Sequence, residues 1–219
     1  MKLSALRTIR LALLLALSAL PAAQAQMEAF TAPVQEGFAA YKAALLAKDG
    51  AKAVTLLSAN SFAYYDRMRK LALSGSREEI ERLPDVDRLL TLSLRVRVPR
   101  ETLESGSARD IVAYAIGAGM ISANSVAKAE LGEINIKDDQ AEGQILVNQS
   151  PVGAVFRFHS EDGVWKFDLE HVTVLARGTV AAMAEKNGTS ENEVILQFLS
   201  KMTGKTIGPE IWQPLRPAQ

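Results

Sequence analysis

The stretch from Ser125 to Val174 constrains the fold of this chain most, because polar and apolar residues alternate through four successive segments of it. Successive side chains of a β-strand point to opposite faces, so alternation is typical of strands with one apolar face. The four segments can be paired in one register that keeps their apolar residues together. The pattern predicts a curved, four-stranded antiparallel meander that needs helices to cover one side.

Three tight turns define this register. Asp162-Gly163 is a strong signal for a two-residue hairpin turn, and turns at Gln149-Ser150 and Asp138-Asp139 continue the same apolar face. A slip of one residue would invert both faces, so the pattern specifies the pairing. The predicted pairs are Phe158 with Phe167, Phe156 with Leu169, Ala154 with His171 and, on the polar face, Arg157 with Asp168.

One row across the predicted sheet is a candidate cavity. Two of its positions carry small residues, which leave space beside an imidazole on the same face. The row consists of Gly132, Ile145, Ala154 and His171, with Phe156 nearby on the same face.

Helices are predicted on either side of the sheet. A helix starting at Thr31 and Pro33 carries apolar residues at helical spacing and ends at Asp49-Gly50. Further helices are expected at 51–57, after a cap at Ser61, and after two boxes of the type in which a serine and an acid cap each other. These boxes are Ser76 with Glu79 and Ser107 with Asp110.

The segment 84–98 can be interpreted in two ways. Residues 90–98 alternate strictly, which is typical of a strand. Pro84, Asp85 and Asp87 instead indicate the first turn of a helix that carries apolar residues at helical spacing. We favour the helix, and the strand stays an alternative.

After the sheet, Val180 to Lys186 and Ser190 to Met202 are predicted helices, the second closed by Gly204. The tail from Thr206 is expected to be an extended strap or a frayed end with an exposed Trp212. The fold class is therefore α+β: a helical N-terminal half packed on the meander, with a C-terminal helical extension at 175–219.

The N-terminus is typical of an export signal. Lys2, Arg7 and Arg10 precede the apolar run Leu11 to Leu20, and Ala23-Gln24-Ala25 is a small-residue cleavage site. We expect a signal peptide at 1–25, a main domain at 26–174, and a periplasmic or secreted product. No later segment is long and apolar enough to predict a membrane span.

Composition narrows the possible functions. The chain has 25 acidic and 25 basic residues, and three of the basic ones lie in the leader, so the remainder is slightly acidic. This balance disfavours nucleic-acid binding. There is no cysteine, which excludes disulfides and thiolate metal sites. No motif predicts a cofactor or a metal.

A helical first half with a Phe- and Tyr-bearing helix and an Asp-Gly break precedes a meander ending in Asp-Gly-Val-Trp-Lys-Phe-Asp-Leu. This arrangement resembles the nuclear transport factor 2-like superfamily from about Phe30 to Val174. The resemblance implies a cone-shaped α+β domain with a helix-lined pocket. Some members use the pocket for isomerisation or dehydration, and many use the fold for binding or dimerisation.

His171 is the best candidate for chemistry, as a base, a donor to a ligand or a pH-sensitive group, although a histidine at a core edge is the commoner role. Tyr65 and Tyr114 have hydroxyls that can orient a ligand, although buried tyrosines more often serve packing. His159 is predicted on the polar face as a solvated group, which argues against a two-histidine metal site. Asp168 and Glu170 are expected in a salt-bridged exterior.

Two functions follow as hypotheses. The first is an exported, non-catalytic domain that binds a small apolar ligand or a protein partner through the cone. The alternative is a small-molecule isomerase or dehydratase with His171 as the base and Tyr65 or Tyr114 as the donor. A homodimer formed through the outer face of the sheet is compatible with both.

Overall fold

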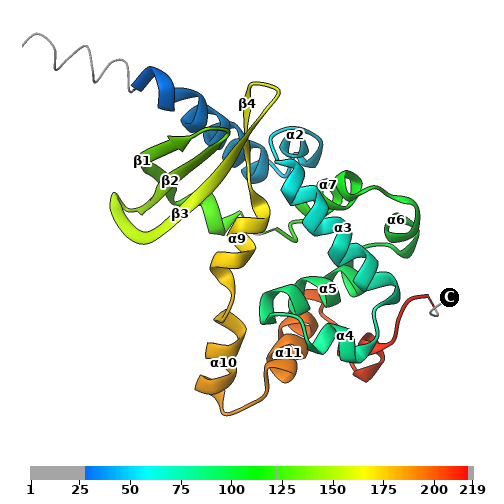
Figure 1. Ribbon diagram of the computed structural model, residues 1–219. Coiled ribbons are helices and arrows are strands. Elements are labelled where there is room, and N and C mark those ends of the chain that lie inside the picture. Colours follow the sequence, from blue (N-terminus) through cyan, green and yellow to red (C-terminus); the bar gives the residue numbers. More distant parts are fainter. Residues whose placement is uncertain (1–27, 122, 217–219) are drawn as a thin grey trace, which may run out of the picture.

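The computed structural model describes residues 28–121 and 123–216, so the predicted signal peptide lies outside the described residues. Figure 1 shows helices in the N-terminal half, a four-stranded antiparallel sheet and a group of C-terminal helices, which confirms the α+β class. Within the described ranges, none of the helices has both the length and the apolar character needed to cross a membrane.

The first helix covers 28–46 in the described part, so Thr31 lies inside it and does not start it. The predicted cap of α3 is also displaced, because Ser58, three residues before Ser61, accepts the hydrogen bond from the N–H of Ser61. Both predicted capping boxes are confirmed. The helices that follow the first are α2 (Gly50–Val54), α3 (Ala59–Ser74), α4 (Arg77–Glu81), α5 (Asp85–Arg97), α6 (Arg100–Ser105), α7 (Ala108–Gly117) and α8 (Asn124–Ala127).

The ambiguous segment is the helix α5. It packs against α3 on one side and against the C-terminal helices on the other. Leu94 is fully buried in the core next to the sheet, whereas Leu92 is fully buried in a second core with the C-terminal helices. A helix buried on two sides tolerates apolar residues at every second position, which explains its strand-like pattern.

The sheet consists of β1 (Ala129–Lys137), β2 (Gln140–Val147), β3 (Ser150–Glu161) and β4 (Val164–Phe167), in that order. The turns at Asp138-Asp139 and Asp162-Gly163 are confirmed. Asp162 and Gly163 both have positive φ, as a type I′ hairpin turn requires. The middle turn lies at Asn148-Gln149, one residue before its predicted position.

The predicted register holds at one end of the sheet. Gly143 pairs with Phe156, and Phe158 pairs with both Ala141 and Phe167. Irregularities in β1 and β2 shift the pairing at the other end, where Ile145 lies opposite Leu131. The predicted pairing of Ile145 with Gly132 is therefore wrong.

The fourth strand ends at Phe167, and the chain turns into the helix α9 (Leu169–Ala176). Asp168 is the N-cap of α9, and its Oδ1 accepts the backbone N–H of His171 at 3.1 Å. The predicted continuation of the strand to Val174 is wrong, and with it the pairs of Phe156 with Leu169 and of Ala154 with His171. A local cap outweighs the short alternation, because Asp168 stabilises a helix start.

The first helix covers the apolar face of the sheet. The ring of Phe38 lies 5.3 Å from that of Phe156 and 5.7 Å from that of Phe167, and Tyr41 stacks on Phe167 at 4.6 Å. Aromatic contacts of this kind make the main core next to the sheet.

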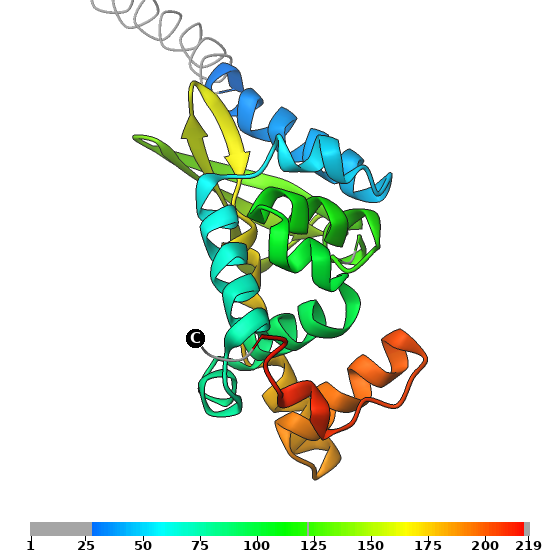
Figure 2. The same cartoon turned by 90° about the vertical axis from the view of Figure 1, so that its right-hand side faces the viewer.

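The C-terminal segment is α10 (Thr179–Asn187), α11 (Glu191–Thr203) and the 3₁₀ helix η1 (Pro209–Trp212). In Figure 2 these orange and red elements lie at the end of the molecule away from the blue first helix. They form the second core with α4 and α5, and Trp212 is only 3% exposed. The prediction of an exposed tryptophan in an extended tail is wrong, because α4 and α5 provide a surface on which it packs.

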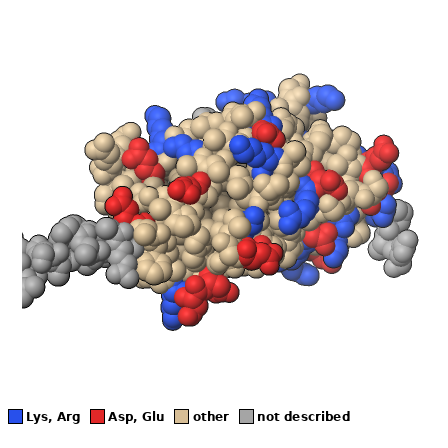
Figure 3. Space-filling model, turned by 90° about the horizontal axis from the view of Figure 1, so that it is seen from above, with Lys and Arg blue, Asp and Glu red and all other residues tan. Residues whose placement is uncertain are grey.

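One face of the molecule shows how the charged side chains are distributed. On the face shown in Figure 3, acidic and basic residues are interspersed, and neither sign forms a continuous area.

Candidate functional site

A groove of about 580 Å³ lies next to α5, α9 and α11. Its walls are mainly apolar. The side chains that give it this character include Leu89 and Leu90 of α5, Met120 and Ile121 after α7, Val172 and Ala176 of α9, and Phe198 and Met202 of α11.

The groove exists because α9 is a helix. Leu169, Val172 and Ala176 recur at helical spacing and all three line the groove. Phe198 and Met202 of α11 line it as well, yet they remain 42% and 39% exposed. The chain therefore leaves large apolar side chains in contact with solvent at a concave site, where a ligand would cover them.

Few polar groups face the groove. Tyr65 of α3 is buried, and burial raises the pKa of its hydroxyl, so it stays a phenol at neutral pH. Its hydroxyl makes no hydrogen bond with the described residues. Ser93 of α5 and Thr173 of α9 also lie in the lining. These groups can orient a bound molecule by hydrogen bonds.

Among the described residues that line the groove, one carries a charge: Arg97, the last residue of α5. Burial lowers the pKa of its guanidinium, and the nearby Tyr114 opposes this effect. Tyr114 itself is 36% exposed, and its hydroxyl donates to the carbonyl oxygen of Arg97 at 3.2 Å. Of the two predicted tyrosines, Tyr65 therefore lines the groove, while Tyr114 contacts the backbone at the end of α5.

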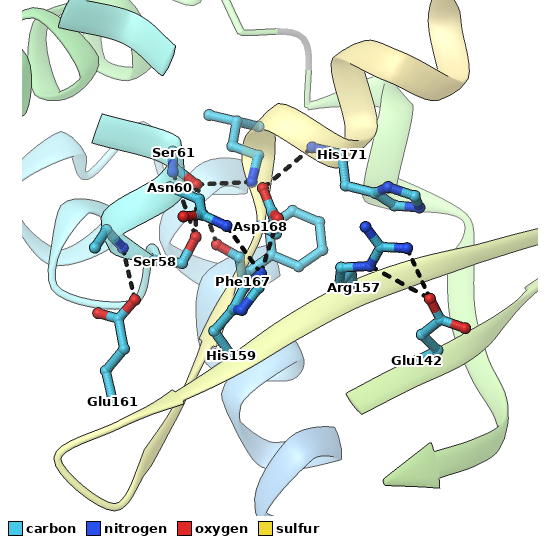
Figure 4. Close-up of polar contacts among 12 residues, drawn as sticks. Ser58, Asn60, Ser61, Glu142, Arg157, His159, Glu161, Phe167, Asp168 and His171 are labelled. Carbon is cyan, nitrogen blue, oxygen red and sulfur yellow. Dashed lines mark hydrogen bonds and ion pairs between the residues drawn. The ribbon is translucent and has the colours of Figure 1, made fainter. Parts of the chain in front are cut away.

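His171 lies elsewhere. Figure 4 shows its imidazole beside Arg157 of β3, whose guanidinium donates to Glu142 at 2.8 Å. Arg157 alternates with Phe156 along β3, so it points to the face opposite to the Phe156 ring. The prediction that His171 shares a face with Phe156 and Phe167 is therefore wrong.

The environment of His171 disfavours its charged form. Burial is the main cause that lowers its pKa, and the positive charge of Arg157 adds to it. Asp168, Glu142 and a backbone contact with Val155 act in the opposite direction but do not compensate. The buried Nε2 has no hydrogen-bond partner among the described residues.

The predicted cavity row is not formed. A Cβ atom on Gly132 would lie 2.7 Å from the Oε1 of Gln144 and 3.1 Å from Leu146, so side chains occupy that space. Ile145 and Phe156 are buried in the main core, and Ala154 packs against it. These residues belong to the packing between the sheet and the helices.

A polar cluster joins the start of α3 to the junction of β4 and α9 (Figure 4). Asp168 is 4% exposed, and its Oδ2 lies 3.0 Å from the Nε2 of His159. Asn60 contacts the same nitrogen at 3.4 Å, and Ser61 Oγ accepts the backbone N–H of Leu169 at 2.8 Å. His159 and Asp168 are thus covered by α3, and their predicted solvated positions are wrong, whereas Glu170 does form an exposed ion pair with Arg67.

This cluster does not form a nucleophilic site. The hydroxyl of Ser61 is fully buried and lies within hydrogen-bond distance of Ser58 and of the Phe167 carbonyl. No contact joins it to His159 among the described residues, so the serine lacks the adjacent base that nucleophilic catalysis requires. The cluster attaches the start of α3 to the junction of β4 and α9.

Sequence reasoning missed the groove, although α11 carried a signal. Apolar residues cover more of α11 than one face can bury: Val194, Ile195 and Leu199 enter the second core, whereas Phe198 and Met202 do not. Large apolar side chains that the fold itself does not bury indicate a surface that binds a ligand or another protein.

No protein-family model, curated protein or solved structure matches this chain. The resemblance to the nuclear transport factor 2-like superfamily stays a prediction from the sequence.

Proposed function

We propose that this protein is exported to the periplasm or secreted, and that it binds a small apolar molecule without catalysing a reaction. The groove next to α5, α9 and α11 is the observation that carries the proposal. Its volume of about 580 Å³ lies within the roughly 300 to 1,000 Å³ of small-molecule pockets. The mainly apolar walls and few polar groups are also typical of such pockets.

The alternative of an isomerase or dehydratase receives no support from the geometry. The groove lining contains Tyr65, whereas His171 faces the polar side of the sheet and Tyr114 contacts the backbone of Arg97. A general base must lie within hydrogen-bond reach of the proton that it removes. The three side chains do not share a site in which this requirement is met.

A protein partner is the second candidate, and exposed apolar residues outside the groove favour it. Val174 and Leu175 of α9 and Met183 of α10 are each 40% to 45% exposed. They do not line the groove, so a small ligand in the groove would not cover them.

Binding of uncharged alkanols tests the proposal. Burying one methylene group contributes about 0.8 kcal/mol, so two more methylenes should tighten binding roughly tenfold. Displacement of the uncharged fluorescent probe N-phenylnaphthylamine by octanol, decanol and dodecanol measures this dependence. We expect affinity to rise along the series.

A matched pair of variants locates the site. Ala176→Trp places an indole in the groove and should abolish probe binding, because Ala176 is part of the lining. Ala182→Trp adds the same group to an exposed position of α10 outside the lining and should leave binding unchanged. Probe binding that survives Ala176→Trp, or no alkanol binding by the natural protein, would refute the proposal.

Size-exclusion chromatography with light scattering tests the predicted homodimer separately.

A further inference from the structure

Arg97 differs from the other arginine at the end of α5. Arg95 donates to the carbonyl oxygens of Ala72, Ile211, Leu71 and Gly75, so all three nitrogens of its guanidinium have partners within the fold. Arg97 has five N–H donors and makes one weak contact, from Nη1 to the sulfur of Met202 at 3.9 Å. In the described residues it has no carboxylate partner.

A second hollow continues from the groove at Arg97. It has a volume of about 320 Å³ and shares Arg97, Met120 and Met202 with the groove. Thr203, the last residue of α11, and Lys205, two residues further on, complete its polar side. The ammonium of Lys205 has no ion-pair partner within the described part of the chain.

Neither hollow contains an acidic residue in its lining. A third cation lies close to the groove, because the Nζ of Lys48 lies 3.7 Å from the position that a Cβ atom on Gly119 would occupy. Gly119 is part of the groove lining. Two cations without acidic partners among the described residues, Arg97 and Lys205, therefore line the smaller, more polar hollow, and Lys48 lies near the groove at Gly119.

This distribution of charge is costly in the empty protein. A guanidinium that is partly removed from water loses hydration, and the apolar walls around Arg97 provide no compensating charge. An anion bound by the planar fork of the guanidinium would compensate with charge-assisted, bidentate hydrogen bonds.

We infer that the ligand of the groove is an anionic amphiphile, whose single acyl or alkyl chain lies along α9 and α11 and whose carboxylate or phosphate head is bound by Arg97 and Lys205. The inference rests on the proposed function and adds the chemical class of the ligand. One chain is specified because the groove has the volume of a pocket for one drug-sized molecule.

Four ligands that share one chain test the role of the head. Dodecanoate, dodecyl phosphate, dodecanol and dodecylammonium are titrated below their critical micelle concentrations against bound N-phenylnaphthylamine. We expect at least one of the two anions to bind tenfold or more tightly than dodecanol, and dodecylammonium to bind most weakly. Comparison of the two anions distinguishes a fatty-acid-like head from a phospholipid-like one.

Variants assign the head to the two cations. Arg97→Gln should reduce the anion affinity by tenfold or more and leave the dodecanol affinity unchanged, and Lys205→Gln should act in the same direction. Arg97→Lys should retain part of the preference for anions over dodecanol, because lysine keeps the positive charge but lacks the planar guanidinium that makes bidentate hydrogen bonds. Arg100→Gln and Lys201→Gln remove neighbouring exposed cations that do not line either hollow and should have no effect.

The outcomes separate the two proposals. Equal affinities for dodecanol and both anions in the natural protein would overturn the inference and leave the proposed function standing. The same conclusion follows if the anion preference survives both Arg97→Gln and Lys205→Gln. Failure of all four ligands to displace the probe would refute the proposed function itself. Thermal unfolding of each variant shows whether it is folded, and retained dodecanol binding shows that its groove is intact.

Discussion

Asp85, in the first turn of α5, accepts a hydrogen bond at 2.8 Å from the backbone N–H of Val180, in the first turn of α10. The same carboxylate accepts the N–H groups of Gly178 at 2.9 Å and Ala181 at 3.3 Å. Helix α10 has no cap from its own chain segment, since its N-cap is Gly178. One carboxylate from a distant helix therefore satisfies the free donors at the start of α10.

Replacing Asp85 with alanine should destabilise the protein by about 2 kcal/mol, because loss of a capping side chain costs about 0.5 to 2 kcal/mol and buried donors lose their partner. Urea unfolding followed by circular dichroism measures the change. Asp66→Ala is the control, since this carboxylate is exposed to a greater extent and pairs with Arg69 and Lys70 on the same helix. An equal loss in both variants would contradict the capping role.

Asp85 should also make stability depend on pH. Burial works to raise its pKa, but the N–H groups of Gly178, Val86, Ala181 and Val180 together lower it. A carboxylate with a lowered pKa stabilises the fold above its unfolded pKa of about 3.9, and this contribution disappears as the pH falls through the lower folded value. Urea unfolding between about pH 5 and pH 2 should show a shallower decline for Asp85→Asn than for the natural protein.

His171 predicts a pH dependence in a different range. Its pKa is lowered by burial and by Arg157, so the folded state favours the neutral ring. Its contribution to stability is therefore complete above the unfolded pKa of about 6.5 and is lost as the pH falls through the folded value. In His171→Leu, the change in stability between about pH 7 and pH 5 should be smaller. The same slope in this variant would show that another group titrates.

Arg95→Met should destabilise the protein by roughly 3 kcal/mol, because removing a buried, hydrogen-bonded charge leaves its partners unsatisfied. The guanidinium joins α5 to the end of α3 and to the carbonyl of Ile211, and burial lowers its pKa to about 10. The fluorescence of the adjacent, buried Trp212 should shift to the red at lower denaturant concentration than in the natural protein. Arg100→Met, at an exposed ion pair with Glu104, should change stability by less than about 0.5 kcal/mol.

Gly50→Ala should cost about 2 to 3 kcal/mol, because overpacking at a rigid contact forces the backbone to move. A Cβ atom on Gly50 would overlap the carbonyl oxygen of Ala113, so α2 and α7 must separate. Gly117→Ala is the matched control, since its nearest contact is an ordinary 3.8 Å. Thermal unfolding should rank Gly50→Ala well below a near-neutral Gly117→Ala.

Individual residues show which features of the fold could be predicted from the sequence. The boxes at Ser76 and Ser107, the turns at Asp138 and Asp162, and the inward faces of Phe156, Phe158 and Phe167 were all predictable. In contrast, α9 was mistaken for a strand, because the polarity pattern after Asp168 fits both structures and only the buried cap distinguishes them.

Of the residues that were predicted from the sequence to form the site, Tyr65 is the one that lines the groove. The groove depends on α9 being helical, and on α11 meeting α5 with two apolar side chains left over. No local sequence motif indicates either of these two conditions.

By itself the sequence determined the helix starts at the capping boxes of α4, α7 and α11, two of the three hairpin turns and the apolar face of the sheet. These features depend on interactions between residues a few positions apart, or on strands joined by a tight turn. Only the tertiary structure decided that α5 is buried on two sides, that Trp212 enters a core, and that Arg97 ends an apolar groove. Burial and the local charge balance arise from segments that are distant in the chain, so they exist only once those segments are packed together.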